Sequence, residues 1–210
     1  MKTKERILLG SLSLFNKDGA TEVTTNDIAK ELKMSPGNLY FHYKNKEQII
    51  REIFKKLSAE TVKVWKPQTK NAKKNEQPHL VEFIDKNLEL YWKYRFFHRE
   101  TYTLRKKDPE LSKLWRAHIK KLTLMMIILH KHWVKSGYMI PMQSKYELEY
   151  LAELLFVSSN SFMQFFATVD KGEAEANPRA LNKVRSHIMR LLLPYVSGET
   201  KDDIEKIIKK

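Results

Sequence analysis

The chain has 210 residues, of which 42% are hydrophobic, and it contains no cysteine. This apolar fraction is enough to build globular cores, and the missing cysteine excludes disulfides, thiolate metal ligands and a cysteine nucleophile. The formal net charge of +14 favours a polyanionic partner, although lysine-rich helices that are simply solvated explain much of this excess equally well.

Apolar residues recur at spacings of three and four along the chain and seldom alternate, which predicts an all-α fold. Basic residues before the apolar stretch Ile7–Leu9 superficially resemble an export signal, but Gly10 interrupts the stretch and no small-x-small cleavage pattern follows. The longest later apolar run, 122–129, is too short to span a bilayer. We therefore expect a cytoplasmic protein that makes no membrane contact.

Capping signals divide the first third of the chain into short helices. Thr25 is a candidate N-cap, Ser35 is followed by Pro36 at the first helical position, and Asn45 with Gln48 has the spacing of a capping box. The predicted helices are residues 4–18, 25–32, 36–42 and 46–65.

The remaining elements follow a polar, basic, proline-flanked stretch that is typical of a linker. One long helix is predicted from residue 80 to about 106, and the next runs from 109 to 136, where Gly137 supplies a stop. Ser144 with Glu147 opens another helix. The last predicted helices are residues 144–169, 178–193 and a charged segment at 201–210.

The segment 25–46 carries the strongest functional signal. It predicts a short helix, a tight turn at Lys33 and Met34, and a second short helix, with Ile28 and Leu39 available to pack the pair. The second helix begins with small or polar residues, so its N-terminus could enter a DNA major groove.

These residues resemble the N-terminal domain of the TetR family of bacterial one-component transcriptional regulators. The resemblance covers residues 4–55 and rests on Phe15, Gly19, Thr25, Ile28, Ala29, Leu39, Tyr40, His42, Tyr43, Lys46 and Glu47. It implies a sequence-specific DNA-binding regulator, a repressor released from its operator by a small-molecule effector. The implied partners are double-stranded DNA, that effector and a second copy of the chain.

The resemblance also implies roles for single residues. Tyr40, His42 and Lys46 would contact the DNA backbone, Thr25 would anchor the first helix to a phosphate, and the start of the second helix would face bases. For His42 and Tyr43 ordinary packing is an open alternative, and base contact by Asn38 is equally open. The predicted DNA-binding residues are Thr25, Asn26, Ser35, Pro36, Gly37, Asn38, Tyr40, His42 and Lys46.

Lys33 departs from the family pattern, because the family commonly has glycine at this position of the turn. A non-glycine residue in a left-handed conformation costs about 1 kcal/mol. The predicted organisation is a helix-turn-helix domain at 1–45, a connecting helix at 46–66, a basic linker at 67–78 and a helical effector-binding and dimerisation domain at 79–210.

The C-terminal part is rich in large apolar residues, most of which should form core or dimer interface. Homodimerisation is expected through the helices at 145–169 and 178–193, whose apolar residues cover more than one stripe. An effector pocket also needs polar groups among apolar walls. The predicted lining is Tyr91, Arg99, Tyr102, His118, Met126 and His130. An inward Arg99 or His118 would favour an anion and an inward Glu100 a cation, and the sequence leaves this open.

Other classes of function have weaker support. His130 and His132 lie two residues apart on a helix and cannot share a metal, and no glycine-rich phosphate loop or nucleophile motif occurs, so we expect no metal, no cofactor and no enzyme activity. The main rival is an architectural protein that binds nucleic acid without sequence choice. A lipid-binding or drug-binding carrier is a third reading.

Overall fold

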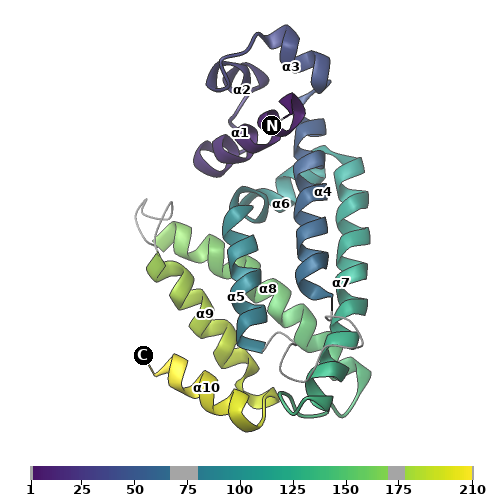
Figure 1. Ribbon diagram of the computed structural model, residues 1–210, viewed down its shortest axis with the longest axis vertical. Coiled ribbons are helices and arrows are strands. Elements are labelled where there is room, and N and C mark those ends of the chain that lie inside the picture. Colours follow the sequence, from purple (N-terminus) through teal and green to yellow (C-terminus); the bar gives the residue numbers. More distant parts are fainter. Residues whose placement is uncertain (1, 67–79, 170–177, 210) are drawn as a thin grey trace. The chain divides into compact units, whose positions relative to one another are not determined.

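The computed structural model describes residues 2–66, 80–169 and 178–209 (Figure 1), so the predicted linker at 67–78 lies outside the described residues. Within these ranges the chain is helical, with one isolated β-bridge between Met139 and Val196. The predicted all-α fold is therefore confirmed. None of the described helices combines the length and the hydropathy needed to cross a lipid bilayer.

The helix bounds agree with the sequence pattern in most places. The elements are α1 (Thr3–Asp18), α2 (Thr25–Glu31), α3 (Pro36–His42), α4 (Lys46–Trp65), α5 (Leu80–Lys93), α6 (Arg95–Lys107), α7 (Pro109–Lys135), α8 (Lys145–Val169), α9 (Pro178–Leu192), the 3₁₀ turn η3 (Leu193–Tyr195) and α10 (Gly198–Ile208).

The prediction of one continuous helix from 80 to 106 is wrong, because the helix is interrupted at Tyr94, between α5 and α6. The side chain of Asn16 on α1 satisfies the backbone at this break. Its amide nitrogen donates to the carbonyl of Lys93 at 2.9 Å, and its oxygen accepts from the backbone N–H of Phe96 at 3.1 Å. The apolar spacing continues across the break, so periodicity alone does not reveal it.

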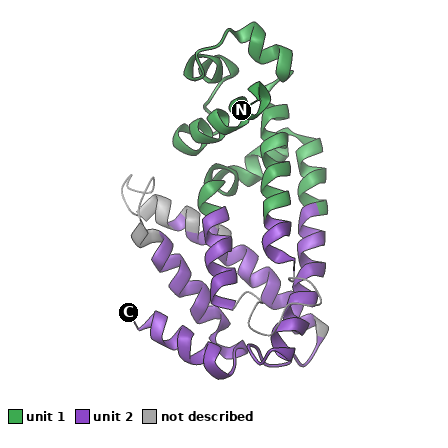
Figure 2. Cartoon of the chain, in the orientation of Figure 1, with its two compact units in different colours: residues 1–60, 91–117 green, residues 61–90, 118–210 purple. Residues whose placement is uncertain are grey.

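The chain divides into two compact units (Figure 2). Unit 1 comprises residues 1–60 and 91–117, and unit 2 comprises residues 61–90 and 118–210. This division differs from the predicted boundaries, because α6 and the start of α7 belong with the N-terminal helices. Since α4, α5 and α7 each contribute to both units, no single linker separates them.

Each unit has an aromatic core of its own. In unit 1, Phe15 packs on Phe96 with ring centroids 5.3 Å apart, and Phe54 stacks on Phe97 at 4.9 Å. The larger apolar core of unit 2 gathers residues from α4, α5, α7, α8, α9 and α10. Its largest buried members include Trp65, Phe83, Leu122, Met126, Trp133, Leu151, Ile188 and Ile204.

Candidate nucleic-acid interface

The turn between α2 and α3 has the left-handed backbone that was expected of it. Lys33 has φ of 51°, and Met34 donates its N–H to the carbonyl of Ala29 at 3.0 Å, which closes the turn. Gly10 on α1 lies directly against the Leu32 side chain, and a Cβ atom at Gly10 would collide with it. Lysine therefore takes the strained turn position without changing the helix-turn-helix geometry.

Capping fixes where α2 and α3 begin. Ser35 caps α3 as predicted, with its hydroxyl accepting the N–H of Asn38 at 3.1 Å. The predicted cap of α2 is wrong by one residue, since Thr24 and Asp27 form the reciprocal capping box. Hydrogen bonds from the side chain and backbone of Thr24 lower the pKa of the Asp27 carboxyl.

The shift of the cap to Thr24 leaves the Thr25 hydroxyl available for another partner. Its oxygen lies 2.8 Å from the hydroxyl of Tyr40 on α3, so the structure brings these two predicted phosphate contacts together. Tyr40 remains 48% exposed. A hydroxyl pair at the edge of the motif, open to solvent, has the chemistry to donate to phosphate oxygens.

The outer face of α3 is defined by the residue that α3 buries. Leu39 is 1% exposed, and successive helical residues turn by about 100°, so Gly37 and Phe41 lie on the side opposite Leu39. Nothing lies within 4 Å of where a Cβ atom of Gly37 would be. Phe41, which is not among the predicted DNA contacts, is 83% exposed. The other predicted contacts at this end of the motif, Asn26, Ser35, Pro36 and Asn38, are all exposed.

Lys46 at the start of α4 binds protein rather than facing solvent. Its ammonium donates to the carbonyls of Ala20, Thr21 and Val23 at 2.6, 3.2 and 2.7 Å. An ammonium group has three protons, and here each has a carbonyl partner. Lys46 therefore holds the loop between α1 and α2, and the predicted phosphate contact would require one of these bonds to be exchanged.

The two aromatic residues that end α3 differ in burial. Tyr43 is 5% exposed and its hydroxyl donates to the carbonyl of Lys4 at 3.4 Å, which supports the packing alternative for this residue. Burial raises the pKa of the Tyr43 phenol. His42 is half-buried and its ring meets that of Phe41 edge-on, with centroids 5.1 Å apart.

A polar clamp within unit 1 joins α6 to the loop after α1. The carboxylate of Glu100 accepts the backbone N–H of Ala20 at 2.7 Å and that of Thr21 at 2.8 Å, and it also accepts the Thr21 hydroxyl. Arg99 donates to the carbonyl of Asn16 at 2.8 Å. Arg99 and Glu100 thus both bind backbone of unit 1, and the assignment of Arg99 to an effector pocket stays a prediction.

The other predicted effector residues are not gathered in one unit. In unit 1, Tyr91 stacks on His98 with centroids 4.0 Å apart, whereas Tyr102 is 76% exposed and so cannot line an enclosed pocket of its unit. In unit 2, Met126 belongs to the apolar core and His130 lies 3.3 Å from the carbonyl of Ile140.

His118, the remaining predicted effector residue, is buried in unit 2. Burial, aided by the nearby charge of Lys121, lowers the pKa of its imidazole to about 4. The ring is therefore neutral at physiological pH, so it does not supply the positive charge that was considered for binding an anion.

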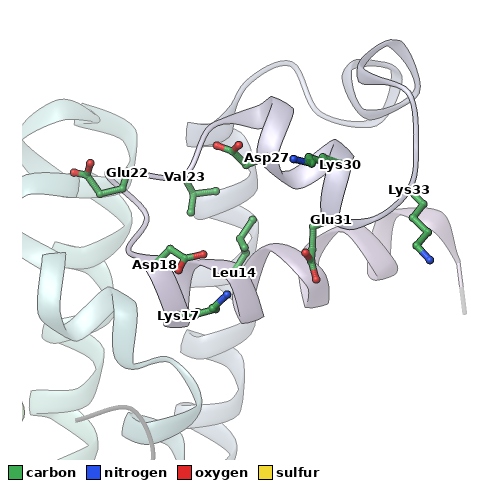
Figure 3. Close-up of a pocket in the computed structure, with 9 residues that line it drawn as sticks. All are labelled: Leu14, Lys17, Asp18, Glu22, Val23, Asp27, Lys30, Glu31 and Lys33. Atoms are coloured by element: carbon green, nitrogen blue, oxygen red, sulfur yellow. The ribbon is translucent and has the colours of Figure 1, made fainter. Parts of the chain in front are cut away.

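A hollow of about 580 Å³ lies between α1 and α2 (Figure 3). It is lined by Leu14, Lys17, Asp18, Glu22, Val23, Asp27, Lys30, Glu31 and Lys33. The lining has four acidic and three basic side chains, and none of the predicted effector residues is among them. In the part of the chain that the structure describes, no three His, Cys, Asp or Glu side chains are grouped to hold a metal ion.

Two models of one known protein family match the chain. Residues 7–53 match the model for bacterial regulatory proteins of the tetR family, and residues 46–204 match the TetR model described as a bacterial transcriptional repressor. The chain belongs to the TetR family. Its helix-turn-helix and its larger C-terminal helical region are both features of that family's models, so the predicted family is confirmed.

Individual relatives agree with this assignment. The chain is 30% identical over 124 residues to the transcriptional regulator QacR of Staphylococcus aureus, a match that covers 57% of this chain and 66% of QacR. It is 37% identical over 49 residues to the negative regulator IcaR of Staphylococcus epidermidis, covering 23% of this chain and 26% of IcaR. These matches thus span less than two thirds of either relative.

Solved structures of transcriptional regulators match nearly the whole chain. A regulator from Marinobacter aquaeolei has 26% identity and a TM-score of 0.83, covering 100% of this chain and 98% of its own. A regulator from Saccharomonospora viridis, solved in complex with choline, has 17% identity and a TM-score of 0.68, covering 93% and 98%. At 17% identity, the match to the Saccharomonospora viridis protein shows a similarity of fold only.

Proposed function

We propose that this TetR-family protein represses transcription by binding a palindromic operator as a homodimer, and that a small molecule bound in unit 2 releases it. The observation that carries the DNA-binding part is the outer face of α3. Gly37 and Phe41 lie on this exposed face, with the Thr25–Tyr40 hydroxyl pair at its edge, on helices held rigidly by caps.

An apolar stripe on α8 supports the homodimer. Tyr146, Tyr150, Val157 and Phe165 are 81%, 64%, 63% and 57% exposed. Their spacings of four, seven and eight residues place them on one helix face. Large exposed apolar faces usually mark protein interfaces. Leu148 and Leu151 on the same helix are buried within unit 2, so the proposed interface on α8 comprises the two tyrosines, Val157 and Phe165.

Aromatic packing in unit 2 supports the class of effector. Trp65 meets Phe83 at 5.3 Å and stacks near Phe156 at 6.0 Å, while Phe83 meets Trp133 at 5.0 Å. Indole faces bind quaternary ammonium groups through cation–π attraction. We therefore propose this aromatic cluster as the effector site and choose choline as the first probe, since a transcriptional regulator of similar fold has been solved with it.

Selection of bound fragments from genomic DNA, followed by footprinting, tests the regulator. We expect a protected palindrome with half-sites one helical turn, about 10 base pairs, or a multiple of it apart. Tyr40→Phe, which removes only a hydroxyl, should weaken binding to every sequence alike, because phosphate contacts position the protein without specifying bases. Salt-dependent binding with no preferred sequence would favour the architectural rival.

Sedimentation tests the dimer. The protein should be dimeric at micromolar concentration, and Tyr150→Glu should yield folded monomer. Tyr102→Glu is the matched control, because Tyr102 is also largely exposed, at 76% against 64% for Tyr150, but lies on α6 in unit 1. If both substitutions leave the dimer intact, the α8 stripe is not the interface.

Choline tests the effector class in two measurements. It should quench the fluorescence of Trp65 and Trp133 and lower the fraction of operator bound. Quenching that is equal in a Trp133→Phe variant would place choline elsewhere. If millimolar choline neither quenches fluorescence nor releases DNA, quaternary ammonium ligands are excluded.

A further inference from the structure

Phe41 is an unusual residue for its position. The other large apolar residues of α2 and α3, Ile28 and Leu39, are at most 1% exposed, whereas Phe41 is 83% exposed. Its neighbour Tyr40 is also exposed but has a hydroxyl that pairs with Thr25. A phenyl ring has no hydrogen-bonding atom, so Phe41 cannot take the phosphate-binding role proposed for Tyr40.

The position of Phe41 on α3 restricts what its ring can meet. Phe41 lies one helical turn after Gly37 on the face opposite buried Leu39. Because Gly37 has no side chain and open space around its Cα, this face of α3 can approach a flat surface closely at that point. The phenyl ring is then the first bulky group to reach the floor of a groove.

The major groove offers one apolar group to such a ring. Among the four bases only thymine presents a methyl group there, while the other base edges present hydrogen-bond donors and acceptors that a phenyl ring would leave unpaired. We propose that Phe41 selects thymine in each operator half-site by packing its ring against the thymine 5-methyl group. This inference rests on the proposed binding of operator DNA through α3.

Deoxyuridine substitution isolates the methyl group. Uracil keeps the base pair of thymine but lacks its methyl, so each thymine of the selected operator is replaced singly, in one half-site at a time. One position per half-site should lose affinity by about fourfold, the effect of one buried methyl-sized group. In a Phe41→Ala variant the same replacement should change affinity by less than about 1.5-fold, because the partner of the methyl has gone.

Control variants separate this role from general effects. Phe41→Leu keeps an apolar group and should retain part of the preference for thymine over uracil. Tyr40→Phe should weaken thymine and uracil duplexes equally, leaving their ratio as in the original protein. Since Phe41 is so exposed, its replacement should leave the melting temperature measured by circular dichroism unchanged, which verifies that the variants are folded.

Two results would overturn the inference. In the first, Phe41→Ala weakens thymine and uracil duplexes by the same factor and so retains the full sensitivity to the missing methyl. The second is a loss of DNA bending without any change in methyl dependence, since that would make Phe41 a wedge between base steps. If instead no preferred operator is recovered in the selection, it is the proposed function that fails, before Phe41 is tested.

Discussion

Both units have an aromatic core, but unit 1 also has polar side chains that bind backbone groups far away in the sequence, whereas the core of unit 2 gathers mainly rings and aliphatic groups. Asn16 and Glu100 each bond to backbone about 80 residues away. Trp65, Phe83 and Trp133 in unit 2 meet ring to ring. Hydrogen bonds are directional and fix a geometry, which suits the presentation of α3 to a groove. Apolar cores of suitable volume tolerate repacking, which would suit the ligand binding proposed for unit 2.

The largest expected effect on stability comes from replacing two asparagines, one in each unit. Asn16→Ala should lower the free energy of unfolding by about 2–5 kcal/mol, because it leaves the Lys93 carbonyl and the Phe96 N–H unpaired beside a buried side chain. Asn87→Ala removes the acceptor of the Trp65 indole N–H and should cost about 1–2 kcal/mol. Urea unfolding followed by circular dichroism measures both.

The asparagine comparison fails if the two substitutions cost the same. A second check uses operator binding, because Asn16→Ala loosens the scaffold of α3. It should weaken DNA binding at temperatures where the protein is still folded, whereas Asn87→Ala should leave DNA binding intact.

The buried imidazole of His118 makes the apolar unit sensitive to acid. Its folded pKa, about 4, lies below its ordinary value of 6.5, so the unfolded chain binds the proton more tightly. Stability is therefore full above pH 6.5 and falls as the pH drops from 6.5 towards 4, by up to about 3 kcal/mol. His118→Gln should flatten this part of the pH profile of unfolding.

His187→Gln is the control for that measurement, since His187 is an exposed histidine of the same unit. It should leave the slope between pH 6.5 and 4 as it is. A slope that survives His118→Gln would assign the acid sensitivity to other groups.

A substitution at Lys46 tests whether its ammonium group stabilises the fold of unit 1 or binds a DNA phosphate. Lys46→Ala should lower the free energy of unfolding by about 1–2 kcal/mol, because three carbonyls of the loop after α1 lose their donor. Since all three protons are in use, the salt dependence of operator binding should not change. Lys44→Ala, at an exposed position, is the control for stability. If Lys46→Ala reduced the slope of log affinity against log salt concentration by about 1, this would instead support the predicted phosphate contact of Lys46.

The features that the sequence predicted correctly depend on residues close together in the chain. The cap at Ser35, the stop at Gly137 and the left-handed turn at Lys33 depend on residues within one helical turn, so adjacent letters suffice. The break at Tyr94 and the partner of Arg99 depend on Asn16, about 80 residues earlier, and no spacing rule connects them.

Residues of the candidate site were also hard to predict, because burial depends on the three-dimensional packing. Phe41 was missed because an apolar residue in a helix is normally assigned to a core, and only the position of Leu39 against its neighbours shows that Phe41 faces outward. Tyr102 is the opposite case. A large aromatic residue among others was expected to line a pocket, but its face of α6 is exposed.

The smallest predicted effect concerns the turn between α2 and α3 in unit 1, where the substitution acts through the backbone conformation. Lys33 holds φ of 51°, which costs a residue with a Cβ atom about 1–2 kcal/mol, and glycine would remove this strain. Glycine also gives the unfolded chain more freedom, at a cost of about 0.5–1 kcal/mol. Lys33→Gly should therefore stabilise the protein by only about 0.5 kcal/mol, whereas Lys33→Val, which is β-branched, should destabilise it clearly. Because the turn already has the required geometry, operator affinity should rise by less than twofold in Lys33→Gly. A large gain in affinity would mean that lysine distorts the motif and that unit 1 is less precisely fixed than its hydrogen bonds indicate.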